Sequence, residues 1–95
     1  MPNYKIYTPR EDSKLLVKYV RKYSKGIVLD IGTGSGIQAI TAANNKKVNS
    51  VLATDIQDSI IRLNKKNIKN KKIKFLKLDL FNDIKNKKFD TIIFN

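Results

Sequence analysis

The hydrophobic positions along the chain fall into short apolar runs, separated by stretches with helical spacing. The runs are rich in β-branched and aromatic residues and predict four strands, at 27–31, 51–55, 73–79 and 89–94. The other stretches predict helices that begin near Thr8 or Pro9, at Ile37, and at Asp58 or Ser59. Strands that alternate with helices indicate βαβ units, in which the strands are parallel and the crossovers right-handed.

Each predicted helix has its own distribution of apolar residues. In the first, Tyr19 and Tyr23 share the apolar spacing and are expected in the core. The second, 37–43, is apolar nearly all round and should be largely buried. The third places Asn64 on its apolar arc, whereas its basic residues fall on the opposite arc, which predicts an amphipathic helix with a basic outer face.

Composition narrows the possible chemistry. The formal net charge is +12, from 20 Lys and Arg against 8 Asp and Glu, which fits solvated lysines in an asparagine-rich chain as well as a basic face for nucleic acid. Cysteine and histidine are absent, which excludes disulfides, thiolate metal sites and histidine general bases, and we expect no metal. We find neither an apolar run near the roughly 20 residues of a membrane span nor a signal segment after Met1, so we expect a cytoplasmic protein.

A glycine-rich turn follows the first predicted strand. Gly32, Gly34 and Gly36 come after Asp30 in the pattern D-x-G-x-G-x-G. A dinucleotide-binding turn, G-x-G-x-x-G, would require glycine at position 37, where the chain has Ile37. The spacing therefore disfavours NAD, although a tight turn in an unrelated α/β domain remains an alternative.

Acidic residues end three of the predicted strands, at Asp30, Asp55 and Asp79. The carboxyl ends of parallel strands border the ligand crevice in open α/β sheets, so these acids should ring one site. A carboxylate at Asp55, at the end of the second strand, suits hydrogen bonding to the ribose hydroxyls of an adenosine ligand.

The segment from Asp30 to Gly36 resembles motif I of class I S-adenosylmethionine (SAM) methyltransferases. The segment YTPREDSKLL, residues 7–16, resembles the entry segment Y-x-P-x-E-D-[ST]-x-L-L of archaeal and eukaryotic HemK-like methyltransferases. Those enzymes modify the glutamine of the Gly-Gly-Gln loop in class I translation release factors. Residues 89–95 resemble the strand that leads into their Asn-Pro-Pro-Tyr motif. The resemblance implies a Rossmann-like parallel sheet with helices on both faces, here an incomplete form with strand order 3-2-1-4.

The resemblance also implies residues for the methionine end of SAM. Ser13 would lie near that end. Asp30 and the turn from Gly32 through Gly34 to Gly36 would hold the region of the methionine amine and carboxylate.

Further positions would bind the adenosine end and the substrate. By the same resemblance, Asp55 takes the ribose hydroxyls and Ile56 packs on the adenine. Asp79 accepts from the adenine amino group, with Leu80 beside it. Asn95 would be the first residue of the catalytic tetrapeptide.

The resemblance implies a SAM-dependent methyltransferase, or its SAM-binding subunit, that acts on the side-chain amide nitrogen of a release-factor glutamine. An N6-adenine RNA or DNA methyltransferase and a non-catalytic SAM-binding half are the alternatives. We expect residues 1–25 to form an entry segment and helix, and residues 26–95 the SAM-binding core. The strand at 89–94 should present an open apolar edge, so we expect a second polypeptide that completes the sheet and catalytic motif, or self-association. A small zinc-binding activator, which the resemblance also implies, would dock at the third strand.

Overall fold

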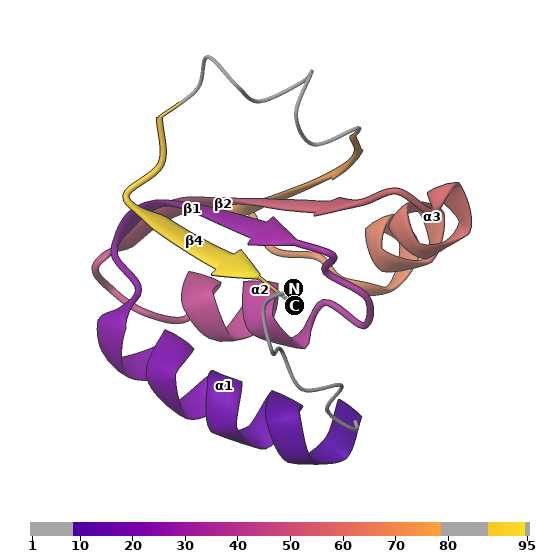
Figure 1. Ribbon diagram of the computed structural model, residues 1–95. Coiled ribbons are helices and arrows are strands. Elements are labelled where there is room, and N and C mark those ends of the chain that lie inside the picture. The colour runs from indigo at the N-terminus through magenta and orange to yellow at the C-terminus, as the bar shows by residue number, and fades with distance from the viewer. Residues whose placement is uncertain (1–8, 79–87, 95) are drawn as a thin grey trace.

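The computed structural model describes residues 9–78 and 88–94, which form a four-stranded sheet and three helices (Figure 1). The elements in chain order are α1 (Pro9–Tyr23), β1 (Gly26–Ile31), α2 (Ile37–Ala43), β2 (Val48–Asp55), α3 (Asp58–Asn67), β3 (Ile73–Lys77) and β4 (Thr91–Phe94). The strands are parallel and take the order β3-β2-β1-β4. The predicted α/β class and strand order are therefore confirmed.

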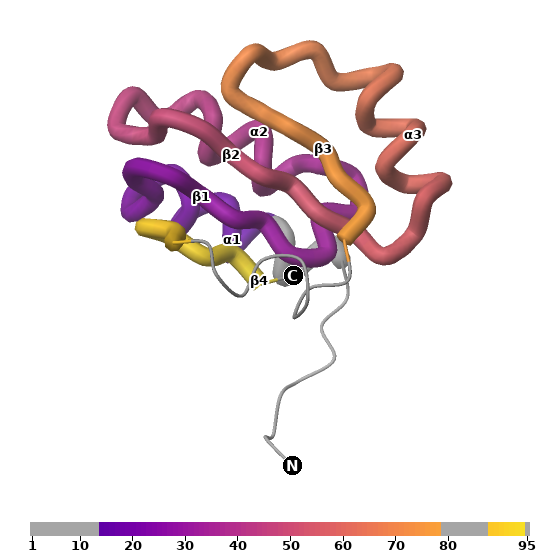
Figure 2. Tube along the Cα trace, turned by 90° about the horizontal axis from the view of Figure 1, so that it is seen from above, coloured from indigo at the N-terminus to yellow at the C-terminus, as the bar shows by residue number. Residues whose placement is uncertain are grey.

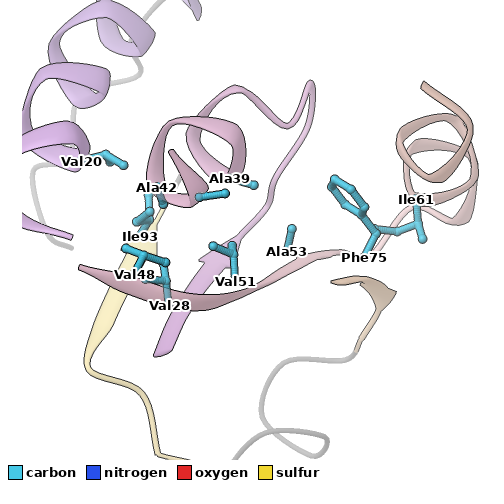
Figure 3. Close-up of a cluster of buried hydrophobic side chains, with 11 residues drawn as sticks. Val20, Val28, Ala39, Ala42, Val48, Val51, Ala53, Ile61, Phe75 and Ile93 are labelled. Atoms are coloured by element: carbon cyan, nitrogen blue, oxygen red, sulfur yellow. The ribbon is translucent and has the colours of Figure 1, made fainter. Parts of the chain in front are cut away.

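The described helices lie on one face of the sheet (Figure 1, Figure 3). The expectation of helices on the second face concerns residues outside the described ranges. Two right-handed crossovers, β1-α2-β2 and β2-α3-β3, step across the sheet in the same direction, which puts both helices on the same side. Helix α1 packs against α2 on that side. The connection from β3 back to β4 runs through residues 79–87, which lie outside the described ranges.

The core fills the space between the sheet and α2 (Figure 3). Val28 and Val51 are buried on neighbouring strands, and Ala39 and Ala42 face them from α2. Because alanine has a small side chain, α2 can lie close to the sheet, and this explains why a helix of only seven residues is buried so fully. Phe75 extends the same core towards α3.

The strand register brings the carboxyl ends of the strands to one edge. Asp30 of β1 pairs with Ala53 of β2 on one side and with Ile93 of β4 on the other. Asp55, the last residue of β2, lies opposite Lys77, the last residue of β3. The turn after β1 therefore opens at the edge where β2 ends.

The opposite end of the sheet is fixed by contacts between β1 and β4. The Ile27 N–H donates to the Asp90 carboxylate at 2.8 Å, and Lys25 and Thr91 exchange two hydrogen bonds at 3.1 Å. Gly26 has a φ of 65°, and a Cβ at that position would collide with Asp90. Gly26 thus lets β4 start directly beside β1.

The prediction that Tyr19 and Tyr23 belong to the core is wrong. Their side chains are 53% and 61% exposed, and their rings stack with centroids 6.2 Å apart. Helix α1 contacts α2 more than the sheet, so it buries only a narrow stripe that includes Val20. The aromatic arc beside that stripe stays exposed.

In the part of the chain that the structure describes, the helices are too short or too polar to cross a membrane. The division into an entry segment, residues 1–25, and a core, residues 26–95, is not tested and stays a prediction.

Candidate cofactor site

The glycine turn between β1 and α2 is the centre of the candidate site. Gly34 has a φ of 54° and Gly36 a φ of 84°, both in the left-handed region that glycine favours. A Cβ on Gly36 would lie 2.6 Å from the Ile68 Cδ1, so the missing side chain lets the turn pack against the residue that follows α3. A Cβ on Gly34 would find no other atom nearer than the Gly32 carbonyl oxygen at 4.0 Å. The missing side chain at Gly36 therefore allows the turn to pack closely against Ile68. At Gly34 it leaves an open side from which a ligand can approach.

Asp55 joins this turn to the end of β2. Its Oδ2 accepts a hydrogen bond from the Gly34 N–H at 3.2 Å, and its Oδ1 accepts one from the Gln57 N–H at 3.0 Å. The residue is 9% exposed, so Asp55 is largely buried. Ile56, the next residue, is 73% exposed. The structure therefore brings together Asp55, Ile56 and the glycine turn, as the sequence predicts.

Asp30 lies beneath the turn and is fully buried, at 0% exposure. Its Oδ2 accepts a hydrogen bond from the Thr33 hydroxyl at 2.8 Å, and its backbone carbonyl accepts one from the Thr54 hydroxyl at 3.3 Å. The Thr33 N–H in turn donates to the Thr54 carbonyl at 2.8 Å. A buried carboxylate must be hydrogen-bonded to be tolerated, and here the bonds tie the first residues of the turn to β2. Direct contact between Asp30 and a ligand stays a prediction.

Asn64 is a site-supporting residue that sequence reasoning missed. Its Nδ2 donates to the Gly34 carbonyl at 2.8 Å, and the residue is 4% exposed. The signal was present, because a polar side chain on the apolar arc of a helix needs a buried partner. Helical spacing alone cannot say which partner that is.

The remaining predicted site positions cannot be placed. The side chain of Ser13 and the residues Asp79, Leu80 and Asn95 lie outside what the structure describes. Their roles stay predictions. Within the described ranges, no group of three or more acidic, cysteine or histidine side chains is arranged to hold a metal ion.

The charge around the turn differs from that of the whole chain. Residues 26–45, which include β1, the turn and α2, contain no lysine or arginine although the chain carries 20 basic residues. Asp55 is the charged group that touches the turn from β2. The local field therefore favours a ligand with positive charge near the turn over a polyanion.

The family model described as methyltransferase small domain matches residues 10–95. A candidate protein N5-glutamine methyltransferase of Methanocaldococcus jannaschii is 38% identical over 95% of the chain, which spans 46% of that relative. The release factor glutamine methyltransferase of Fusobacterium nucleatum is 35% identical over 95% of the chain and 28% of its own length. The ribosomal RNA small subunit methyltransferase C of Buchnera aphidicola is 42% identical over 87% of the chain and 24% of its own length. The chain thus spans less than half the length of each of these relatives.

A solved structure shares the fold. The Trypanosoma brucei PRMT1 enzyme–prozyme heterotetrameric complex with AdoHcy matches with a TM-score of 0.63 and 26% identity. The match covers 87% of this chain and 27% of the other.

The hydrogen bond from Asn64 to Gly34 leads to a prediction about the free energy of unfolding that requires no ligand. Substitution Asn64→Ala leaves the Gly34 carbonyl without its donor, so we expect the free energy of unfolding to fall by about 1–3 kcal/mol. Urea unfolding followed by circular dichroism measures the change. Asn67→Ala, at an exposed position on the same helix, is the matched control and should change stability by less than about 0.5 kcal/mol. Equal effects of the two substitutions would contradict the role given to Asn64.

Proposed function

The chain belongs to the methyltransferase small-domain family, and we propose that it forms the SAM-binding part of a methyltransferase. The observation that carries the proposal is the hydrogen bond between the Asp55 carboxylate and Gly34, which sets an acid beside an open glycine turn. The structural relative solved with AdoHcy supports the choice of cofactor.

The described residues fit SAM. The open side of Gly34 lets a ligand approach the backbone, and the near-buried Asp55 offers acceptors to a pair of ribose hydroxyls. The exposed side chain of Ile56 lies next in the chain and suits the flat face of adenine. The absence of basic residues from 26–45 suits a cofactor with a positive sulfonium.

We assign the other predicted residues to the same ligand. Asp30 acts through Thr33 as a positioning residue for the turn that holds the methionine end of SAM. Ser13, Asp79 and Leu80 are proposed as further cofactor contacts, and their side chains lie outside the described part of the structure.

The proposed reaction is methylation of a glutamine side-chain amide nitrogen. When bound, SAM supplies a methyl group on a positively charged sulfur, which leaves as a neutral thioether. The amide nitrogen is a poor nucleophile because its lone pair is delocalised. Asn95 would accept one N–H of that amide through its side-chain oxygen, and the carbonyl of a proline would accept the other. This holds the nitrogen in line with the methyl group, and one N–H proton is released to water as the N–C bond forms.

The proposed substrate is the glutamine of a Gly-Gly-Gln loop in a translation release factor. The entry segment at 7–16 and the names of the relatives from M. jannaschii and F. nucleatum support it. Because the chain spans less than half of these relatives, the complete active unit is part of the proposal.

We further propose that a second polypeptide, or a second copy of the chain, covers the sheet at β4. This strand is at one end of the sheet order, and its Ile92 and Phe94 are 59% and 72% exposed. Natural proteins rarely leave an apolar edge strand bare, because it recruits other strands. A small zinc-binding activator, implied by the resemblance, would use the other edge strand, β3.

The cofactor assignment predicts the effect of removing the acid. Asp55→Ala should weaken S-adenosylhomocysteine binding by about 1.5–3 kcal/mol, because two hydroxyls lose a charged acceptor. Isothermal titration calorimetry measures this, with NAD as a ligand that should not bind. Asp58→Ala, which removes an exposed acid from the start of α3, is the control and should bind normally. Unchanged affinity in Asp55→Ala would remove this residue from the site.

A mass-spectrometric assay tests the substrate. The complete enzyme and SAM should add one methyl group to the Gly-Gly-Gln peptide of a release factor. A release factor with Gln replaced by Glu in that loop is the control and should stay unmodified. Label in total RNA and none in the peptide would support the adenine alternative and contradict the glutamine proposal.

Light scattering after size-exclusion chromatography tests the covered edge. The isolated chain should elute above the 10.9 kDa of a monomer, and Phe94→Lys should shift it towards the monomer. Leu63→Lys, at a position on α3 that is 57% exposed, is the control and should leave the mass unchanged. A soluble monomer of 10.9 kDa with full activity would contradict the proposal.

A further inference from the structure

Lysine is concentrated in one segment of the chain. The segment 65–77 contains seven lysines, Lys65, Lys66, Lys69, Lys71, Lys72, Lys74 and Lys77, and residues 59–78 contain no acid. Residues 26–45, by contrast, contain no basic residue at all. Burial of β1 and α2 accounts for the absence of lysine from residues 26–45, but it does not explain the absence of acids from the exposed positions of residues 59–78.

The segment is continuous in the chain, and we call it the α3–β3 lysine surface and define it as residues 65–77. It runs from the last turn of α3 through a turn to β3, the edge strand of the sheet (Figure 2). A groove of about 580 Å³ lies on it. Its lining includes Lys65, Lys69, Lys71 and Lys74, together with partly buried apolar residues.

These lysines are not neutralised within the described part of the chain. The ion pair found there joins Arg62 to Asp58, outside the surface. The Lys69 ammonium contacts the Lys65 carbonyl at 2.8 Å, and the Lys72 ammonium contacts the Asn45 carbonyl at 3.3 Å, but neither contact cancels a charge. Lysines in the last turn of a helix are favoured by its dipole, yet this does not explain the four lysines from 71 to 77.

We propose that the α3–β3 lysine surface binds the sugar–phosphate backbone of a nucleic acid. Lysine ammonium groups are point charges that suit phosphate oxygens, and contacts to phosphate carry no sequence information, so the proposed binding is independent of sequence. The aromatic residue of the segment, Phe75, is only 5% exposed and is not available to stack on bases. Lysines border the groove, and residues 59–78 contain no acid, which favours a polyanionic backbone as the partner.

The lysines that line the groove are distinct from the residues that form the candidate cofactor site. The surface borders that site, because Ile68 lies against Gly36 and Lys77 lies opposite Asp55. The inference therefore does not depend on the proposed methyl acceptor. The α3–β3 lysine surface holds the protein on a nucleic acid, while methyl transfer takes place at the candidate cofactor site.

Fluorescence anisotropy with the full chain tests this inference. The probes are a short labelled single-stranded RNA and a DNA duplex of the same sequence, titrated over a range of salt concentrations, with polyglutamate as a competitor. The test variant is Lys65→Gln, Lys69→Gln, Lys71→Gln. The control variant is Lys14→Gln, Lys18→Gln, Lys22→Gln on α1, which removes the same charge from exposed positions elsewhere.

We expect the test variant to bind single-stranded RNA at least about fivefold more weakly. The slope of log K against log salt should fall by about 2, since each lost phosphate contact contributes about 0.7 for a single strand. The control variant should lose less than about twofold. Comparison of the two probes shows whether RNA or DNA is preferred. Equal losses in both variants, no binding of either probe at physiological salt, or tight binding of polyglutamate with none of nucleic acid would each overturn the proposal.

Discussion

The backbone of Gly34 is held from two directions, and the candidate site depends on this arrangement. The Gly34 N–H donates to the Asp55 carboxylate at the end of β2, and the Gly34 carbonyl accepts from the Asn64 amide on α3. Elements from two different βαβ units therefore determine the course of one turn. Because both backbone groups are satisfied by the protein, the turn keeps its shape without a ligand and leaves its open side for one.

A layer of buried polar residues supports this turn from below. Asp30, Thr33 and Thr54 are buried and bonded to each other at the carboxyl edge of the sheet, directly above an apolar core. Burying polar groups costs free energy unless each finds a partner, so such a layer is stable only in one arrangement. The apolar core supplies most of the stabilisation, and the polar layer fixes the conformation of the turn.

Much of this arrangement follows from the sequence. Apolar runs and their alternation with helices predict the parallel sheet, and the spacing from Asp30 to Gly36 predicts a turn with Asp55 close by. One expectation was wrong for a physical reason, because α1 contacts α2 too narrowly to bury Tyr23. The partner of Asn64 depends on how α3 packs against the turn, which periodicity does not reveal. The contacts proposed for residues beyond the described ranges, such as Asp79 and Asn95, stay predictions.

The distribution of charge separates the two surfaces that we assign. The turn and its neighbours, residues 26–45, carry one acid, Asp30, and no bases, whereas residues 65–77 carry lysines and no acids. A cationic cofactor and a polyanion therefore have distinct places on one small fold. Nuclear magnetic resonance of the isotope-labelled chain during titration with S-adenosylhomocysteine tests the cofactor site most directly. The amide signals of Gly34 and Ile56 should shift with the ligand while those of Lys71 and Lys72 stay in place; shifts confined to the lysine segment, or none at the turn, would contradict the assignment.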